Sequence, residues 1–279
     1  MASPVRRAAV AGTWYPGHPR QLVSEVESYL SEVPARSLPG RLLGLISPHA
    51  GLRYSGPVAA HGYALLRGRS RLTFVMVGPS HHEAFDGVAV AARGAFETPL
   101  GQVPIDEPLA ASLLDPGLKI VEEPRPHLEE HCLEMQLPFL QHLVSELKIV
   151  PMLMGSQARG EVERLAGALA QGLSGRQDVV LVASSDLSHY HPAKRASILD
   201  ALVVQDVATF DEDGLMARLE ASHGHACGGG PIVAVMRAAR RLGANRTTVL
   251  KYADSGDVPG GDKSRVVGYL SAALWQKES

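Results

Sequence analysis

Cysteines and long apolar runs are scarce in this sequence. Its 279 residues include only two cysteines, Cys132 and Cys227, which excludes a disulfide framework and favours a reducing, intracellular setting. No stretch approaches the roughly 18 consecutive apolar residues of a membrane span. The run after Arg6 and Arg7 soon meets Gly12 and is too short for a signal peptide. We therefore expect a soluble, cytoplasmic protein without a membrane partner.

An excess of one charge is also absent. The chain carries 27 basic and 29 acidic residues, a net charge of −2, so electrostatics gives no case for direct nucleic-acid binding. A local basic cluster at Arg237, Arg240 and Arg241 is typical of a solvated helix face. The sequence shows no repeat, low-complexity segment or linker, and its length is ample for a core. We expect a single domain over residues 1–279.

Short apolar runs alternate with amphipathic segments along the chain. The runs, nearly continuous in hydrophobicity, indicate strands covered on both faces: Leu42–Ile46, Leu72–Val77, Gly87–Ala91, Lys148–Met152, Val179–Ala183, Thr247–Tyr252 and Val266–Leu270. Helical spacing is found at Leu22 to Val33, Pro57–Leu66, Glu107–Leu114, Leu128–Leu143, Glu161–Leu173, Pro192–Phe210 and Pro231–Leu242. Pro57, Pro192 and Pro231 suit a first helical turn, and Pro138 is expected to kink or divide its helix. The alternation predicts an α/β sandwich of three layers.

Histidines follow three of the predicted strands directly. His49 comes after the first strand, His81 and His82 after the second, and Asp186 and His189 after the fifth. Ligands of open α/β folds bind beyond the carboxyl ends of the strands. Three histidines in the same structural position therefore indicate one ligand pocket.

Two of these segments leave alternatives open. His81 and His82 point opposite ways in an extended segment, so we expect one of them in the pocket and favour His81. Asp186 and His189, three residues apart, share a side in a turn. Asp186 then orients an imidazole or touches a metal, and His189 moves a proton. The alternative for Asp186 is a helix cap.

Cys227 precedes three glycines and Pro231, a tight loop that leads into a helix N-terminus. The helix dipole there is expected to lower the thiol pKa and to favour a thiolate that binds metal. A small buried thiol, a redox-active thiol and a covalent nucleophile are the alternatives. The glycines lack the spacing of a phosphate-binding P-loop.

Cys132 lies among residues with helical spacing and is expected to serve packing. His131 and Glu134 would share a helix face. We expect them to support the ligands from outside, or to pair with each other.

Several ordered blocks of the chain resemble the Memo family. The family is similar in turn to the catalytic subunits of class III, non-haem iron, extradiol ring-cleavage dioxygenases. The blocks are AGTWYPG at 11–17, SPHAGLRYSGPVAAHGY at 47–63, VGPSHH at 77–82, ETPLGQVPID at 97–106, EEHCLEMQLPFLQ at 129–141, SSDLSHY at 184–190, CGGGPI at 227–232 and YADSGD at 252–257.

The resemblance implies an α/β/α fold with a mixed, mostly parallel sheet. It implies one metal ion per chain on His49, His81 and Cys227, with Asp186 and His189 as the acid–base pair. Fe(II) is the expected metal. The chain has a cysteine where the dioxygenases use a glutamate, and this softer ligand shifts the preference toward copper or zinc.

Three functions follow as hypotheses. The first is an iron- or copper-dependent oxidoreductase of unknown substrate. The second is a non-catalytic adaptor that binds a phosphopeptide or another anion in the same pocket, and the third is a zinc-dependent hydrolase. A small molecule or peptide is the expected ligand. The resemblance also implies AMMECR-type and radical-SAM proteins as partners.

Overall fold

The computed structural model describes residues 4–222 and 224–277. Its strands are β1 (Val5–Arg6), β2 (Gly40–Ser47), β3 (Thr73–Pro79), β4 (Val88–Val90), β5 (Ala95–Thr98), β6 (Gly101–Pro104), β7 (Ile120–Glu122), β8 (Lys148–Met154), β9 (Val179–Ser184), β10 (His189–His191), β11 (Arg246–Asp254) and β12 (Val266–Lys277). Its α-helices are α1 (Pro19–Ser31), α2 (Leu52–Tyr63), α3 (Glu107–Leu113), α4 (Leu137–Leu143), α5 (Arg159–Gly172), α6 (Ala193–Ala208), α7 (Glu212–Ala221) and α8 (Gly229–Arg241).

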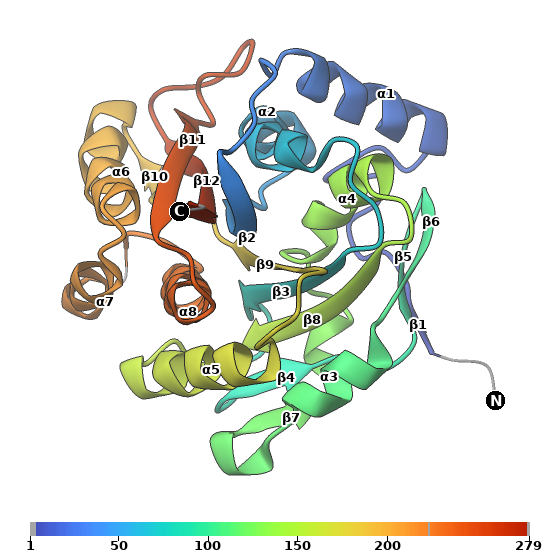
Figure 1. Ribbon diagram of the computed structural model, residues 1–279. Helices are drawn as coiled ribbons and strands as arrows, with labels where there is room; N and C mark the ends of the chain where they lie inside the picture. Colours follow the sequence, from blue (N-terminus) through green and yellow to red (C-terminus); the bar gives the residue numbers. More distant parts are fainter. Residues whose placement is uncertain (1–3, 223, 278–279) are drawn as a thin grey trace.

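A mixed sheet forms the middle layer of the molecule (Figure 1). Its strand order is β10-β12-β2-β9-β3-β8-β4-β7, and β11 pairs with β12. The four central strands β2, β9, β3 and β8 are parallel, whereas β12 and β4 join them antiparallel. Every residue of β3 and β9 is buried, which explains the continuous apolar runs of these strands.

Helices cover both faces of this sheet. On one face α2 packs against β2, β11 and β12, with α1 and α4 behind it. On the other face α8 packs against β2, β3 and β9, flanked by α5 and α7 (Figure 1). The three-layer α/β/α architecture with a mixed sheet is thus confirmed, and each of the seven predicted strands is present.

Two of the predicted helices differ from the structure. Helix α2 begins at Leu52, so Pro57 lies inside the helix and not in its first turn. The helix predicted over Leu128–Leu143 is wrong for its first half, because only Leu137–Leu143 is α-helical. One side-chain carboxylate competes with a helix in this first half: Glu130 accepts the backbone N–H groups of the two residues that follow it. Local bonds of this kind compete with the helical ladder.

Other elements had no sequence signal strong enough to predict them. Strands β1, β5 and β6 form a separate three-stranded sheet, and α7 lies between α6 and α8 in the chain. Among the described residues, no helix is long and apolar enough to cross a membrane.

Candidate metal centre

The register of the parallel strands brings His49 and Asp186 together. Ser47 at the end of β2 pairs with Ser184 at the end of β9, so the residues two positions further on lie side by side. The Oδ1 atom of Asp186 accepts the N–H of His49 at 2.8 Å and the N–H of Ala50 at 3.3 Å. Asp186 therefore fixes the backbone of the His49 loop. It caps no helix, since β10 follows it in the chain.

Three histidines converge at this edge of the sheet. The ligand atoms of His49, His81 and His131 all lie within 4.8 Å of one another. The ring centroid of His81 is 5.1 Å from that of His49 and 4.6 Å from that of His131. Such a group can hold one metal ion. His82 lies outside the group, with its ring 6.3 Å from that of His131.

The buried carboxylate of Glu130 lies beside two of these rings and hydrogen-bonds to that of His81. Its Oε1 atom lies 2.9 Å from Nδ1 of His81 and 3.3 Å from Nδ1 of His131. Burial works against the charge of Glu130, but the hydrogen bonds from His81 and from the N–H of Cys132 outweigh it and hold the pKa of Glu130 well below its usual range. An ionised carboxylate only accepts, so Nδ1 of His81 donates to it and Nε2 is the ring nitrogen left to face a metal. Metal-binding histidines in proteins are held in this way.

The hydrogen bonds of the Ser184 hydroxyl determine which ring nitrogen of His49 carries the proton. The Ser184 hydroxyl donates to the carbonyl of Cys132 at 2.7 Å, so its oxygen accepts from Nδ1 of His49, 2.9 Å away. Nε2 of His49 is then the unprotonated ring nitrogen. Burial, and next the neighbouring His81, lower the pKa of His49 to about 3. The ring is therefore neutral at pH 7, the form that binds metals.

The structure makes His131 a ligand candidate. From the sequence we expected it only to support the metal ligands from outside. Burial, and next the neighbouring His49, lower its pKa to about 3, so it too is neutral. The ring of Trp14 lies against it with centroids 4.3 Å apart. Because residues 128–133 form no helix, His131 and Glu134 share no helix face.

Cys227 approaches the group from the start of α8. Its Sγ atom lies 3.2 Å from Nε2 of His49 and 3.3 Å from the N–H of Asp186. Burial, and next the negative charge of Asp186, raise the pKa of the thiol well above its usual range. The expected lowering of this pKa by the helix dipole is thus wrong for the metal-free protein. A bound metal would remove the proton outright.

Asp186 and His189 have pKa values that converge from opposite sides. Burial raises the pKa of Asp186 to about 6, although the N–H of His49 and the charge of His189 oppose the shift. Burial also lowers the pKa of His189, opposed by the charge of Asp186. An acid and a base whose charges interact and whose pKa values are shifted by burial are candidates to exchange a proton with a bound molecule.

Comparison with known proteins matches almost the whole chain. Residues 6–273 fit the family model described as Memo-like protein. The chain belongs to this family. A MEMO1 family protein of Methanocaldococcus jannaschii is 39% identical over 287 residues, which cover 97% of this chain and 99% of the relative. Another, of Methanosarcina mazei, is 39% identical over 269 residues, with 96% and 98% covered.

Among solved structures, the uncharacterized protein JW3007 from Escherichia coli K12 has a TM-score of 0.53. It covers 84% of this chain and 100% of its own, at 14% sequence identity. At this identity the likeness concerns the fold alone.

From the sequence we missed Glu130 as a functional residue and gave His131 only a supporting role. Both residues lie in the segment that we took for a regular helix, and that prediction hid their part in the site. The signal was the sequence Glu-His-Cys, which puts two groups able to bind a metal next to a carboxylate. Cys132 next to them is buried, with its Sγ donating to the carbonyl of Pro79 at 3.3 Å, and burial raises its thiol pKa.

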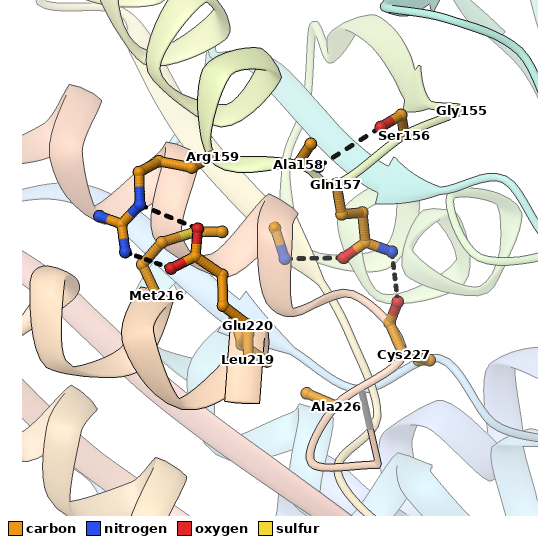
Figure 2. A pocket seen from close by; sticks show the side chains of 11 residues that line it. Gly155, Ser156, Gln157, Ala158, Arg159, Met216, Leu219, Glu220, Ala226 and Cys227 are labelled. Atoms are coloured by element: carbon orange, nitrogen blue, oxygen red, sulfur yellow. Dashed lines mark hydrogen bonds and ion pairs between the residues drawn. The ribbon is translucent and has the colours of Figure 1, made fainter. Parts of the chain in front are cut away.

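A cavity of about 570 Å³ lies behind the Cys227 loop (Figure 2). The Gln157 side chain crosses it: its amide nitrogen donates to the carbonyl of Cys227 and its oxygen accepts the N–H of Gly230, both at 2.7 Å. An Arg159–Glu220 ion pair lies at the other end of the cavity. Gln157 thus fixes the Cys227 loop through two of its backbone groups.

Proposed function

We propose that this protein is a metal-dependent oxidoreductase related to class III extradiol dioxygenases, with one Fe(II) ion per chain. His49, His81 and Cys227 would hold the metal, with His131 beside them. The proposal depends above all on the three imidazoles whose ligand atoms lie within 4.8 Å of one another. A bound iron ion would supply open positions for oxygen and for an oxidisable substrate.

The donor atoms fit a metal of this class. Two of the rings are neutral, and hydrogen bonds direct Nε2 of His49 and His81 to act as the ligand atoms. Metal–nitrogen and metal–sulfur bonds of ~2.1 and ~2.3 Å allow one ion to reach both the Nε2 of His49 and the Sγ of Cys227, which are 3.2 Å apart. Imidazole and thiolate also suit copper and zinc.

The acid–base work would fall to His189 and Asp186. His189 would take a proton from a substrate hydroxyl and return it later. Asp186 would stabilise the charged form of His189 while its Oδ1 holds the His49 backbone in place.

A zinc-dependent hydrolase is the second candidate function. The three-histidine group favours it, because three histidines form one of the ligand sets of catalytic zinc, which activates water. The identity of the metal separates the two candidates.

The test is anaerobic purification followed by metal analysis and assay. We expect close to one iron per chain in the wild type and in the control His82→Ala, and less than about a tenth of that in His49→Ala and His81→Ala. Comparing the metal content of Cys227→Ser with that of His131→Ala decides which residue is the third ligand.

Activity assays separate the candidate functions. Oxygen uptake with catechols tests oxidation, and bound zinc together with ester hydrolysis favours the second candidate. If His49→Ala, His81→Ala and Cys227→Ser all keep the wild-type metal content, the proposed site is wrong. A metal-free wild type that binds phosphopeptides would instead indicate an adaptor.

A further inference from the structure

A second cavity adjoins the acid–base pair. It has a volume of about 380 Å³, and Ala50, Tyr190, Arg265 and Tyr269 are among its lining residues. Ala50 follows the ligand candidate His49, and Tyr190 follows His189. Tyr269 is close enough to Asp186 for the charge of that carboxylate to raise the phenol pKa, after the larger effect of burial. The cavity therefore lies next to the groups to which we assign the proton transfer.

Tyr190 is held in an unusual way at the mouth of this cavity. Its φ of 61° is left-handed, a conformation that costs an aromatic residue of order 1–3 kcal/mol. The side chain is 63% exposed, so burial of the ring does not offset this cost. The guanidinium of Arg265 lies over the ring, 5.3 Å from its centroid. The strained backbone thus presents a tyrosine and an arginine together to the cavity.

The positive charges of the lining have no acidic partners among the described residues. Arg265 makes no ion pair there, and Arg53 contacts only the carbonyl of Pro259, at 3.2 Å, and the ring of Tyr54. Asp262 also lines the cavity and keeps its negative charge, while its oxygens accept the N–H and the hydroxyl of Ser264 at 2.7 Å. The two guanidinium groups outweigh this one carboxylate, so the lining carries a net positive charge that attracts an anion.

We propose that this cavity binds the anionic end of the substrate, a carboxylate or phosphate on a planar apolar group. Arg265 would pair with the anion, Tyr190 would stack on the planar part, and the reactive end would extend past Tyr269 toward His189 and the histidine group. The inference rests on the proposed function for the reaction, but the binding that it predicts does not depend on the metal.

The test compares ligands that differ in charge. Benzoate, phenyl phosphate and neutral phenol are titrated calorimetrically into the metal-loaded protein and into its chelator-treated form. We expect both anions to bind about tenfold more tightly than phenol, with an affinity that falls as salt is added. Arg265→Met should remove this difference. Arg69→Met, which deletes an exposed arginine that lines a different cavity, should keep it. If benzoate binds more tightly, the anionic group of the substrate is a carboxylate; if phenyl phosphate does, it is a phosphate.

The inference is overturned if phenol binds as tightly as the anions, or if Arg265→Met and Arg69→Met behave alike. Metal content is measured on each sample. A protein that fails to take up metal on loading but still binds the anions would count against the proposed function and leave this inference standing. Anion binding that vanishes in the chelator-treated wild type would show direct ligation to the metal, and would also overturn it.

Discussion

Glu130 holds His81 at two points, through the backbone N–H at 2.7 Å and the ring Nδ1 at 2.9 Å. The same carboxylate accepts the N–H groups of His131 and Cys132. One side chain thereby joins the loop after β3 to the segment that carries the third histidine. Outer hydrogen-bond partners of this kind set both the direction and the basicity of a metal ligand.

Glu130→Gln should weaken metal binding by about 10- to 100-fold, because the amide removes the negative charge that fixes the His81 ring. Competition with a chelator measures the dissociation constant. Glu129→Gln is the matched control, since Glu129 is the exposed neighbour. Equal metal affinity in the two variants would show that Glu130 has no orienting role.

Gly228→Ala should displace the Cys227 loop. A Cβ atom there would lie 2.4 Å from the carbonyl oxygen of Ser184 and 2.8 Å from the Cβ of Ser185, so the backbone has to move. We expect a loss of roughly 1–3 kcal/mol in urea unfolding together with a lower metal content. Gly160→Ala in α5 is the control: its nearest neighbour would lie at 3.5 Å, and alanine favours the helix. A Gly228→Ala protein as stable as Gly160→Ala would contradict the predicted contact.

The buried Asp200 supports the backbone ahead of His189. It accepts the N–H of Ser188 at 3.0 Å and the hydroxyl of Tyr252 at 2.8 Å, and a Cβ at Gly268 would lie 2.0 Å from its Oδ2. Gly268→Ala should therefore destabilise the fold by roughly 2–4 kcal/mol. An NMR titration of the histidines should also show a changed pKa for His189, because the backbone that Asp200 holds at Ser188 moves. Wild-type stability with an unchanged His189 titration would refute this account.

His127 should make the metal-free protein sensitive to acid. Burial lowers its pKa to about 4, below the unfolded value of about 6.5. The unfolded chain then binds more protons between these values, so the stabilising contribution is complete above pH 6.5 and is lost as the pH falls toward 4. For this residue the loss amounts to about 2 kcal/mol between pH 7 and pH 5.

His127→Gln tests this prediction, because glutamine does not titrate and can still donate to the carbonyl of Ala89. Urea unfolding at pH 7 and pH 5 should show a smaller difference for the variant than for the wild type. His142→Gln is the control, since that ring is less buried. Equal pH dependence in all three proteins would rule out the role of His127.

The sequence by itself determined the layers of the fold and the edge at which the site lies. Continuous apolar runs identify strands buried on both faces, and residues that follow parallel strands must meet at one edge of the sheet. For this reason His49, His81 and Asp186 could be named from their positions after strands. Because these residues are two histidines and one acid, the sequence also indicated metal binding and proton transfer.

Only the tertiary structure decided which other groups complete the site. His131 and Glu130 come from a segment whose helical spacing was misleading, because the Glu130 carboxylate takes backbone donors that a helix would have used. The pKa of Cys227 likewise depends on burial beside Asp186, 41 residues away in sequence. Burial and the geometry of hydrogen bonds arise from contacts between distant segments, and local sequence does not encode them.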